Sequence, residues 1–117
     1  MLYIPHNFPS FNDINRINKS GKTGYANKIK QEYTNIARIY FLKAKKIDKY
    51  PIKVSFTWYS KTKARDLDGF GFAKKCVLDG MVKSGFIKND NLNCINFIED
   101  KAVISDKIGV IIEWREN

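Results

Sequence analysis

Residues 52–59 have the sequence IKVSFTWY, in which apolar and polar side chains alternate. Successive side chains of a strand point to opposite faces of a sheet, so Val54, Phe56 and Trp58 would share one face. The pattern predicts a half-buried strand, and the other elements are arranged around it.

A long helix is expected before this strand, over about residues 24–47. Its apolar side chains recur at steps of three and four residues: Tyr25, Ile29, Tyr33, Ile36 and Tyr40. Residues 5–24 are interrupted by prolines and glycines, which predicts a loop. Residues 1–4 are apolar and are expected to form a short edge strand.

After the central strand, the sequence predicts a second helix over about 70–84 that ends at Gly85. Two strands are expected around 94–98 and 107–114, joined as a hairpin by the segment from Asp100 to Asp106. This order of elements favours a single α+β domain over 1–117. It would have a mixed sheet of about four strands and two main helices, and it would not be doubly wound.

The formal net charge of +9, from 21 Lys and Arg against 12 Asp and Glu, favours a polyanionic partner such as nucleic acid. Ordinary solubilising charge remains the alternative. The two cysteines, Cys76 and Cys94, lack the histidines that a zinc site would need, since His6 is the only one. We therefore expect buried, reduced thiols in a cytoplasmic protein. The N-terminus does not resemble a signal peptide, and the apolar runs are too short to span a bilayer.

Four carboxylates lie close together in the sequence between residues 66 and 90, among many lysines: Asp66, Asp68, Asp79 and Asp90. Carboxylates beside DNA phosphates repel them unless a divalent cation lies between. In an extended segment Asp66 and Asp68 would project on the same side and reach one ion. Two ordinary explanations stay open, because Asp68 would serve as a helix cap and Asp90 as a turn residue.

Residues 65–90 also carry a succession of short motifs, which are Arg-Asp-Leu-Asp at 65–68, Lys-Lys at 74–75, Val-Leu-Asp-Gly at 77–80 and Ser-Gly-Phe-Ile-Lys-Asn-Asp at 84–90. This succession resembles the RusA family of Holliday junction resolvases, which occur in phages and prophages. The Pro-Ser-Phe-Asn loop at 9–12 and the helix after it look like the opening of that family. The resemblance covers nearly the whole chain.

The resemblance implies a RusA-like fold and a Mg²⁺-dependent endodeoxyribonuclease, with Mn²⁺ as a substitute, that resolves Holliday junctions in DNA recombination and repair. It implies that Asp66, Asp68 and Asp90 bind the metal and are catalytic, and that Lys75 is the catalytic lysine. Asp79 matches a helix carboxylate whose role is uncertain. The family members are homodimers that cut four-way junctions, here in the cytoplasm of a bacterial host.

This chain departs from the family pattern directly after the second aspartate. Gly69 replaces the usual asparagine, and the run over 69–73 is longer than in the shortest members. Lys74 and Lys75 therefore both compete for the role of the catalytic lysine, and counting back from Asp79 favours Lys75. Asn89 stands where some members have another aspartate.

The side chains expected to contact DNA phosphates are Arg16, Lys19, Lys22, Lys63, Arg65 and Lys74. Phe8 and Phe11 lie in the basic N-terminal loop and would stack or wedge at a branch point. The alternative is that both rings pack on the core and anchor the loop.

Two other functions fit the sequence. The first is a restriction-type nuclease that uses Asp90, Glu99 and Lys101, since Glu-x-Lys units near strand ends are typical of that class. The second is a non-catalytic basic DNA-binding module, which the positive charge and the loop aromatics suit equally well.

Overall fold

The computed structural model describes residues 1–10, 13–16, 24–61 and 67–116, except for the side chains of Leu67 and Asp68. A helical turn covers residues 13–16. The other elements are β1 (Leu2–Ile4), α2 (Tyr25–Phe41), β2 (Ile52–Ser60), the 3-10 turn η1 (Leu67–Phe70), α3 (Gly71–Lys83), β3 (Ile95–Ile104) and β4 (Gly109–Glu116). The expected α+β class is confirmed.

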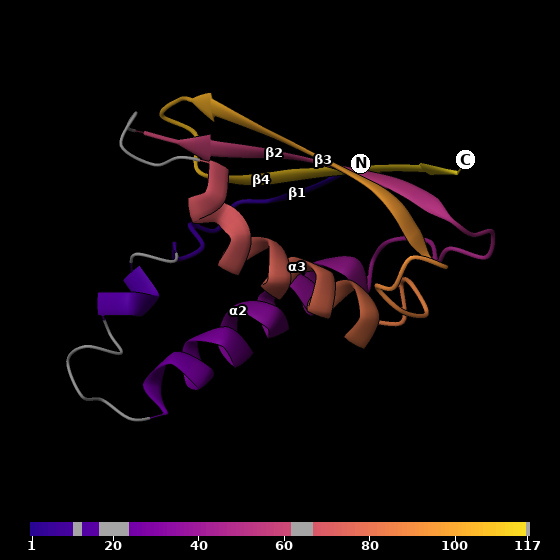
Figure 1. The fold of residues 1–117 in the computed structure, drawn as a ribbon, viewed down its shortest axis with the longest axis horizontal. Coiled ribbons are helices and arrows are strands. Elements are labelled where there is room, and N and C mark those ends of the chain that lie inside the picture. The colour runs from indigo at the N-terminus through magenta and orange to yellow at the C-terminus, as the bar shows by residue number, and fades with distance from the viewer. Residues whose placement is uncertain (11–12, 17–23, 62–66, 117) are drawn as a thin grey trace.

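The four strands form one mixed sheet in the order β1-β4-β2-β3, with β2 inside it (Figure 1). β2 runs parallel to β3, with Phe56 beside Asp100, and antiparallel to β4, with Phe56 beside Ile112. β1 pairs antiparallel with β4 at the far edge, as expected for a short edge strand.

The predicted hairpin between the last two strands is wrong, because β2 separates β3 from β4. β3 follows a crossover through α3, which is the connection that parallel neighbours require. It also extends to Ile104, so most of the expected connecting segment, from Asp100 to Ile104, belongs to the strand. The sequence obscured this because Glu99, Asp100 and Lys101 interrupt the apolar pattern in the middle of the strand.

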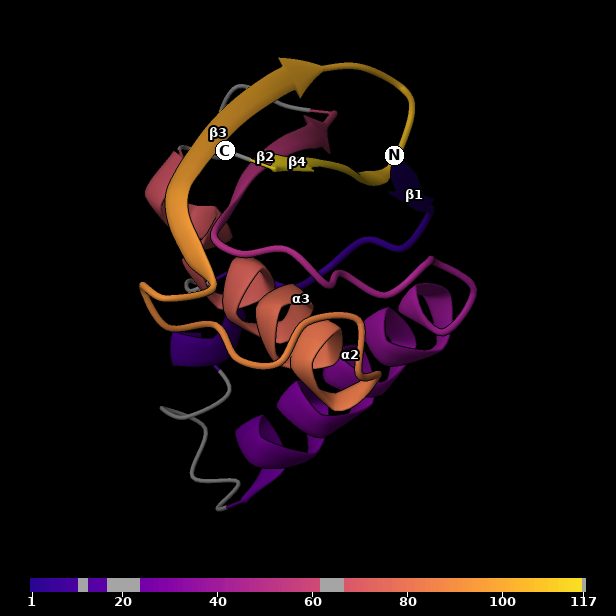
Figure 2. The same ribbon diagram turned by 90° about the vertical axis from the view of Figure 1, so that its right-hand side faces the viewer.

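Both helices cover the same face of the sheet and leave the other face open (Figures 1 and 2). Val54, Phe56 and Trp58 of β2 point into this layer and are buried, as the alternation predicted. The ring of Trp58 stacks on Phe70 of η1, with centroids 5.1 Å apart. The core therefore lies between β2 and the helix pair.

The two helices approach closely where α3 places Gly80 against α2. A methyl group at Gly80 would lie 2.6 Å from Cβ of Ala37 and 2.9 Å from the carbonyl oxygen of Thr34. Real side-chain contacts do not reach such distances, so only glycine fits at this crossing. α3 is thereby held closely against α2 at this crossing.

The predicted C-terminal end is wrong for α2 and correct for α3. α2 ends at Phe41 and not at residue 47, because the chain turns back and the Ile47 N–H donates to the Phe86 carbonyl at 2.9 Å. α3 ends at Lys83, and Gly85 follows with φ of 80°, a conformation that favours glycine. The predicted end of the second helix is confirmed.

Candidate functional site

Three consecutive residues of α3 point in three directions, because each helical residue is rotated by about 100° from the one before it. Lys74 points toward the sheet and reaches Asp100 of β3. Lys75 points toward the turn after α3 and reaches Asp90. Cys76 is fully buried and its thiol faces the Lys30 carbonyl of α2. The two adjacent lysines that the sequence left in competition therefore occupy separate sites.

Lys75 lies between two carboxylates. Its Nζ is 3.2 Å from Oδ1 of Asp79, one helical turn further along α3, and 3.7 Å from Oδ2 of Asp90. Asp79 also faces Lys30 of α2, at 3.5 Å. Charges thus alternate from α2 across α3 to the turn that follows it.

The turn after α3 brings Asp90 back to the helix. Gly85 reverses the chain, and the Asp90 N–H donates to the side-chain oxygen of Asn89 at 2.7 Å. The side chain of Asp90 is 30% exposed and that of Lys75 is 55% exposed, so both are accessible to a ligand from solvent. This Lys75–Asp79–Asp90 cluster is the candidate site.

The carboxylates keep Lys75 in its charged form. The hydrogen bond and the negative charge of Asp79 raise the pKa of Lys75; burial opposes this shift, and Asp90 adds a further, smaller increase. Lys75 is therefore a cation at neutral pH and not a proton acceptor. Burial raises the pKa of the Cys76 thiol to about 11, so this cysteine is not a nucleophile.

The predicted Asp66 lies outside the described residues. The backbone of Asp68 belongs to η1, which leads directly into α3, and its side chain is outside the description. Stacking of Phe70 on Trp58 fixes this turn against the sheet. Of the predicted catalytic residues, the structure therefore brings together Lys75 and Asp90, and Asp79 contacts Lys75 as well.

No group of three or more His, Cys, Asp or Glu side chains able to hold a metal is found among the described residues. The donors in the cluster are carboxylate oxygens, which are the ligands that Mg²⁺ prefers. Asp90 is partly exposed and close to the helix that η1 begins. The described part of the predicted metal set is thus chemically suited to a hard cation.

Asp100 is a residue that the sequence reasoning did not identify. Its carboxylate accepts a hydrogen bond from the Trp58 indole N–H at 3.0 Å and from Lys74 at 2.7 Å. The side chains of Lys74 and Asp100 are only 30% and 23% exposed. Lys74, which was predicted to contact DNA, forms this ion pair in the structure. The signal was hidden because Asp100 was expected in a connecting segment.

The other predicted DNA-contacting residues divide into described and undescribed ones. Arg16 is exposed and pairs with Asp13 at 2.6 Å. Phe8 is buried and packs on Tyr33, with centroids 5.2 Å apart, so it anchors the loop to the core as the alternative held. The remaining predicted residues lie outside the described part: Phe11, Lys19, Lys22, Lys63 and Arg65.

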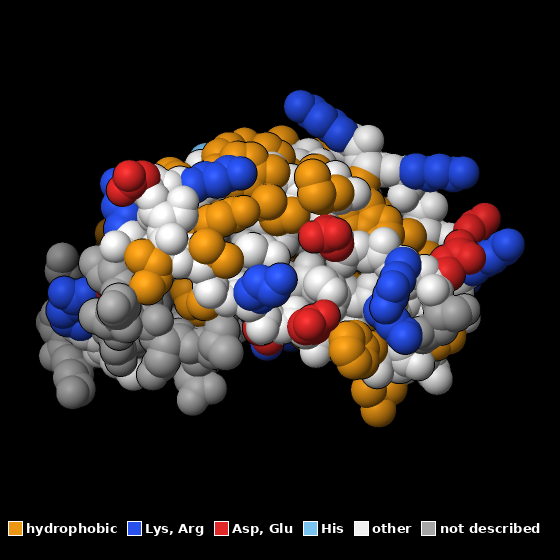
Figure 3. All heavy atoms as spheres, turned by 90° about the horizontal axis from the view of Figure 1, so that it is seen from above, with side chains coloured by type: hydrophobic (Ala, Val, Ile, Leu, Met, Phe, Trp, Pro, Cys, Tyr) orange, Lys and Arg blue, Asp and Glu red, His pale blue; other side chains and the backbone are white. Residues whose placement is uncertain are grey.

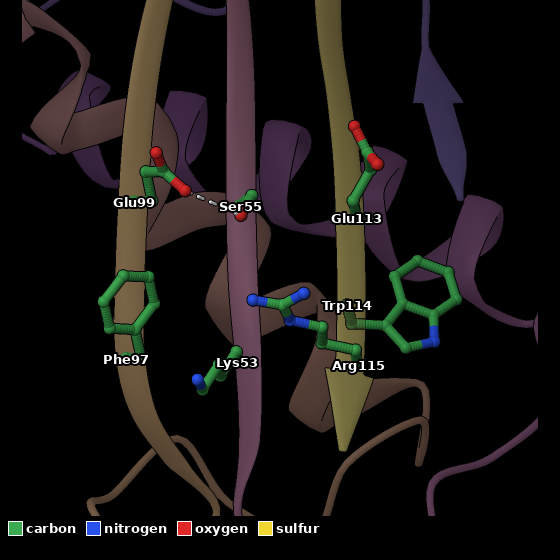
Figure 4. A pocket seen from close by; sticks show the side chains of 7 residues that line it. All are labelled: Lys53, Ser55, Phe97, Glu99, Glu113, Trp114 and Arg115. Atoms are coloured by element: carbon green, nitrogen blue, oxygen red, sulfur yellow. Dashed lines mark hydrogen bonds between the residues drawn. The ribbon is translucent and has the colours of Figure 1, made fainter. Parts of the chain in front are cut away.

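The structure does not bring together the residues of the restriction-type alternative. Glu99 and Lys101 lie beside Ser55 and Thr57, on the face of the sheet that the helices leave open. Asp90 lies beside Lys75 on the helical side. A shallow hollow of about 240 Å³ on the open face contains Glu99 with Lys53, Glu113 and Arg115 (Figure 4).

No helix in the described ranges has both the length and the apolar character needed to cross a membrane. Comparisons with protein-family models, with curated proteins and with solved structures found no match to this chain.

Proposed function

We propose that this protein is a Mg²⁺-dependent endodeoxyribonuclease that resolves Holliday junctions and other branched DNA, in recombination and repair. The observation that carries the proposal is the position of Lys75, which lies between Asp79 and Asp90 on α3, the helix that directly follows η1. A lysine that stays protonated beside partly exposed carboxylates suits a site that acts on a phosphodiester.

The charge of the whole chain supports a nucleic-acid substrate. With a net charge of +9, the protein attracts the DNA backbone over its surface. The carboxylates of the cluster are an exception on such a surface. That exception makes chemical sense where a divalent cation joins carboxylates to a phosphate.

Asp66, Asp68 and Asp90 would hold the ion. Bound there, Mg²⁺ or its substitute Mn²⁺ supplies Lewis-acid polarisation of the phosphodiester and a more acidic water. Lys75 stabilises the negative charge that develops on the phosphoryl oxygens, because its raised pKa keeps it protonated. Asp79 orients Lys75 through the contact at 3.2 Å.

The proposal includes a homodimer, because two identical sites related by a two-fold axis match the symmetry of a four-way junction. It also places the protein in the cytoplasm of a bacterial host, as the product of a phage or prophage. Both statements derive from the resemblance to the RusA family.

The test is cleavage of a synthetic four-way junction with Mg²⁺, compared with linear duplex DNA of the same sequence. Wild type should cut the junction, Asp68→Asn should abolish cutting, and Asp106→Asn should not affect it. Asp106 is an exposed aspartate between β3 and β4, so it controls for the loss of one charge. Absence of metal-dependent cutting of any branched DNA would overturn the proposal. Junction binding without cutting would favour the non-catalytic module.

A further inference from the structure

β3 is the most exposed element of the sheet. It is an edge strand of ten residues that pairs only with β2, and no described segment pairs with its outer edge. β1, the strand at the opposite edge, has only three residues. A long edge strand presents a row of free N–H and C=O groups, which native proteins normally shorten, cover or pair.

The helices leave part of the inner face of β3 exposed, on either side of Asp100. Ile98 and Ile104 point to the helical side, beside Val54 and Ser60, yet they are 41% and 57% exposed. On the open side, Phe97 is 48% exposed. The strand arches along the margin of the molecule, beyond the helices (Figure 2). Among the described residues, β3 therefore has no strand on its outer edge and carries exposed apolar side chains on both of its faces.

Apolar side chains are prominent on the sheet side of the molecule. Seen from above the sheet, they form broad patches with lysine and arginine side chains projecting around them (Figure 3). Exposed apolar patches of this kind, bordered by polar groups, are typical of protein interaction sites.

The sequence of β3 is complementary to itself. On the open face it presents Phe97, Glu99, Lys101 and Val103 in order. When two copies run antiparallel about Asp100, Glu99 of each copy lies opposite Lys101 of the other, and Phe97 lies opposite Val103. Opposite charges and apolar pairs placed in this way stabilise neighbouring strands. Moving the axis by one residue, to Glu99 or to Lys101, would place two like charges opposite each other.

We propose that β3 pairs antiparallel with β3 of a second copy of this chain, around a two-fold axis at Asp100. The pairing joins two four-stranded sheets into one and places the helices of both copies on the same side. The inference deepens the proposed function, on which it rests for the cooperation of two sites, whereas the pairing itself is argued from β3.

At the axis the two Asp100 carboxylates lie on the helical side and face each other. Like charges directly opposite in a sheet are destabilising. Here each carboxylate is already neutralised by Lys74 of its own chain at 2.7 Å and bonded to Trp58 at 3.0 Å. The ion pair inside each copy is therefore a condition for the contact between copies.

A charge-reversal cycle tests the register. Sedimentation velocity should show wild type at twice the chain mass of 13.6 kDa. Glu99→Lys and Lys101→Glu should each raise the dimer dissociation constant by about tenfold or more, because both symmetric pairs become repulsive. The double variant should restore the wild-type value. The single variants change net charge in opposite directions, so a general charge effect cannot produce this pattern. Circular dichroism checks that each variant is folded.

A cysteine pair provides an independent measurement. Phe97→Cys combined with Val103→Cys places thiols opposite each other across the axis, at the separation that a disulfide needs. Mild oxidation should give a covalent dimer on a non-reducing gel, and neither single variant should do so. Cys76 and Cys94 are buried and do not compete.

Three outcomes would overturn the inference: a monomeric wild type at high concentration, a dimer that both single charge variants leave intact, or a cysteine pair that never links two chains. None of these measurements uses DNA or metal. If a dimer forms but the cycle fails while the junction is still cut, only the inference falls; a monomeric wild type that cuts the junction would also remove the homodimer from the proposed function. If the dimer behaves as expected and nothing is cut, only the proposed function falls.

Discussion

Lys74 and Lys75 are neighbours in sequence and have the same side chain, yet the fold gives them different environments. Lys74 forms an ion pair with Asp100, whose carboxylate also accepts a hydrogen bond from the Trp58 indole, and the Lys74 side chain is 30% exposed. Lys75 is 55% exposed and lies between two partly open carboxylates. A step of one residue along a helix therefore separates a lysine that joins α3 to β3 from one that is exposed to solvent.

The largest effect is expected from Lys75→Ala. Loss of this cation should reduce junction cleavage by about 10²-fold or more, because no other described lysine lies within an ion-pair distance of Asp90. The free energy of unfolding should change by less than about 0.5 kcal/mol, since Lys75 is largely exposed. Cleavage rates under single-turnover conditions, with a denaturation curve, measure both.

Lys83→Ala is the matched control for this variant, because Lys83 is an exposed lysine of the same helix. It should leave the cleavage rate within about twofold of wild type. Equal losses from both variants would mean that Lys75 acts only through the general positive charge.

The second effect concerns the Lys74 site and stability. Asp100→Ala leaves the Lys74 ammonium and the Trp58 N–H without their acceptor in a half-buried position. The free energy of unfolding should fall by about 2 kcal/mol. Asp100→Asn, which still offers an oxygen to Trp58, should cost less. Urea denaturation gives both values, and an unchanged midpoint for the alanine variant would contradict the structural role of the pair.

Cys76, on the buried side of α3, predicts that the stability of the fold depends on pH. The pKa of Cys76 is raised from its ordinary 9.0 to about 11, so the folded chain keeps a proton that the unfolded chain loses. Its stabilising contribution is complete below pH 9 and is lost as the pH rises toward 11. The loss should be about 1–2 kcal/mol.

Cys76→Ala provides the comparison for that measurement, because it removes the titrating thiol and leaves all lysines and tyrosines in place. Thermal unfolding at several pH values should show a shallower decline for the variant than for wild type between pH 9 and pH 11. Parallel declines would show that Cys76 does not contribute.

The smallest effect is expected from Lys30→Ala. Lys30 is 41% exposed and lies 3.5 Å from Asp79, so its loss should change stability by about 0.5 kcal/mol or less. Cleavage should persist, since Lys75 keeps its contacts with Asp79 and Asp90. A loss comparable to that of Lys75→Ala would extend the candidate site onto α2.

The local elements of this fold were predictable where side-chain periodicity is strong. The alternation in β2 predicted this strand with the correct buried face, and Gly85 marked the end of α3. β3 was not predictable in the same way. Glu99, Asp100 and Lys101 interrupt its apolar pattern, so its sequence has no continuous apolar face to reveal its length or its neighbour.

For the site, the resemblance singled out Lys75 and Asp90, and the structure brings these two together. The contact of Lys75 with Asp79 is local and follows from helical spacing. Asp100 could not be found in the same way, because its partners Trp58 and Lys74 are far away in the chain and meet it only through the parallel pairing of β2 and β3. Long-range polar contacts of this type leave no periodic trace in a sequence.

Because Gly80 has no side chain, it determines how α3 is rotated about its own axis against α2. Because Ala37 and the backbone at Thr34 press against this position, the helix cannot roll along its neighbour. The rotation of α3 about its axis is therefore fixed by the absence of a side chain at this single position. The directions of Lys74 and Lys75 follow from that rotation, so a distant methyl group would turn both lysines away from their partners at once.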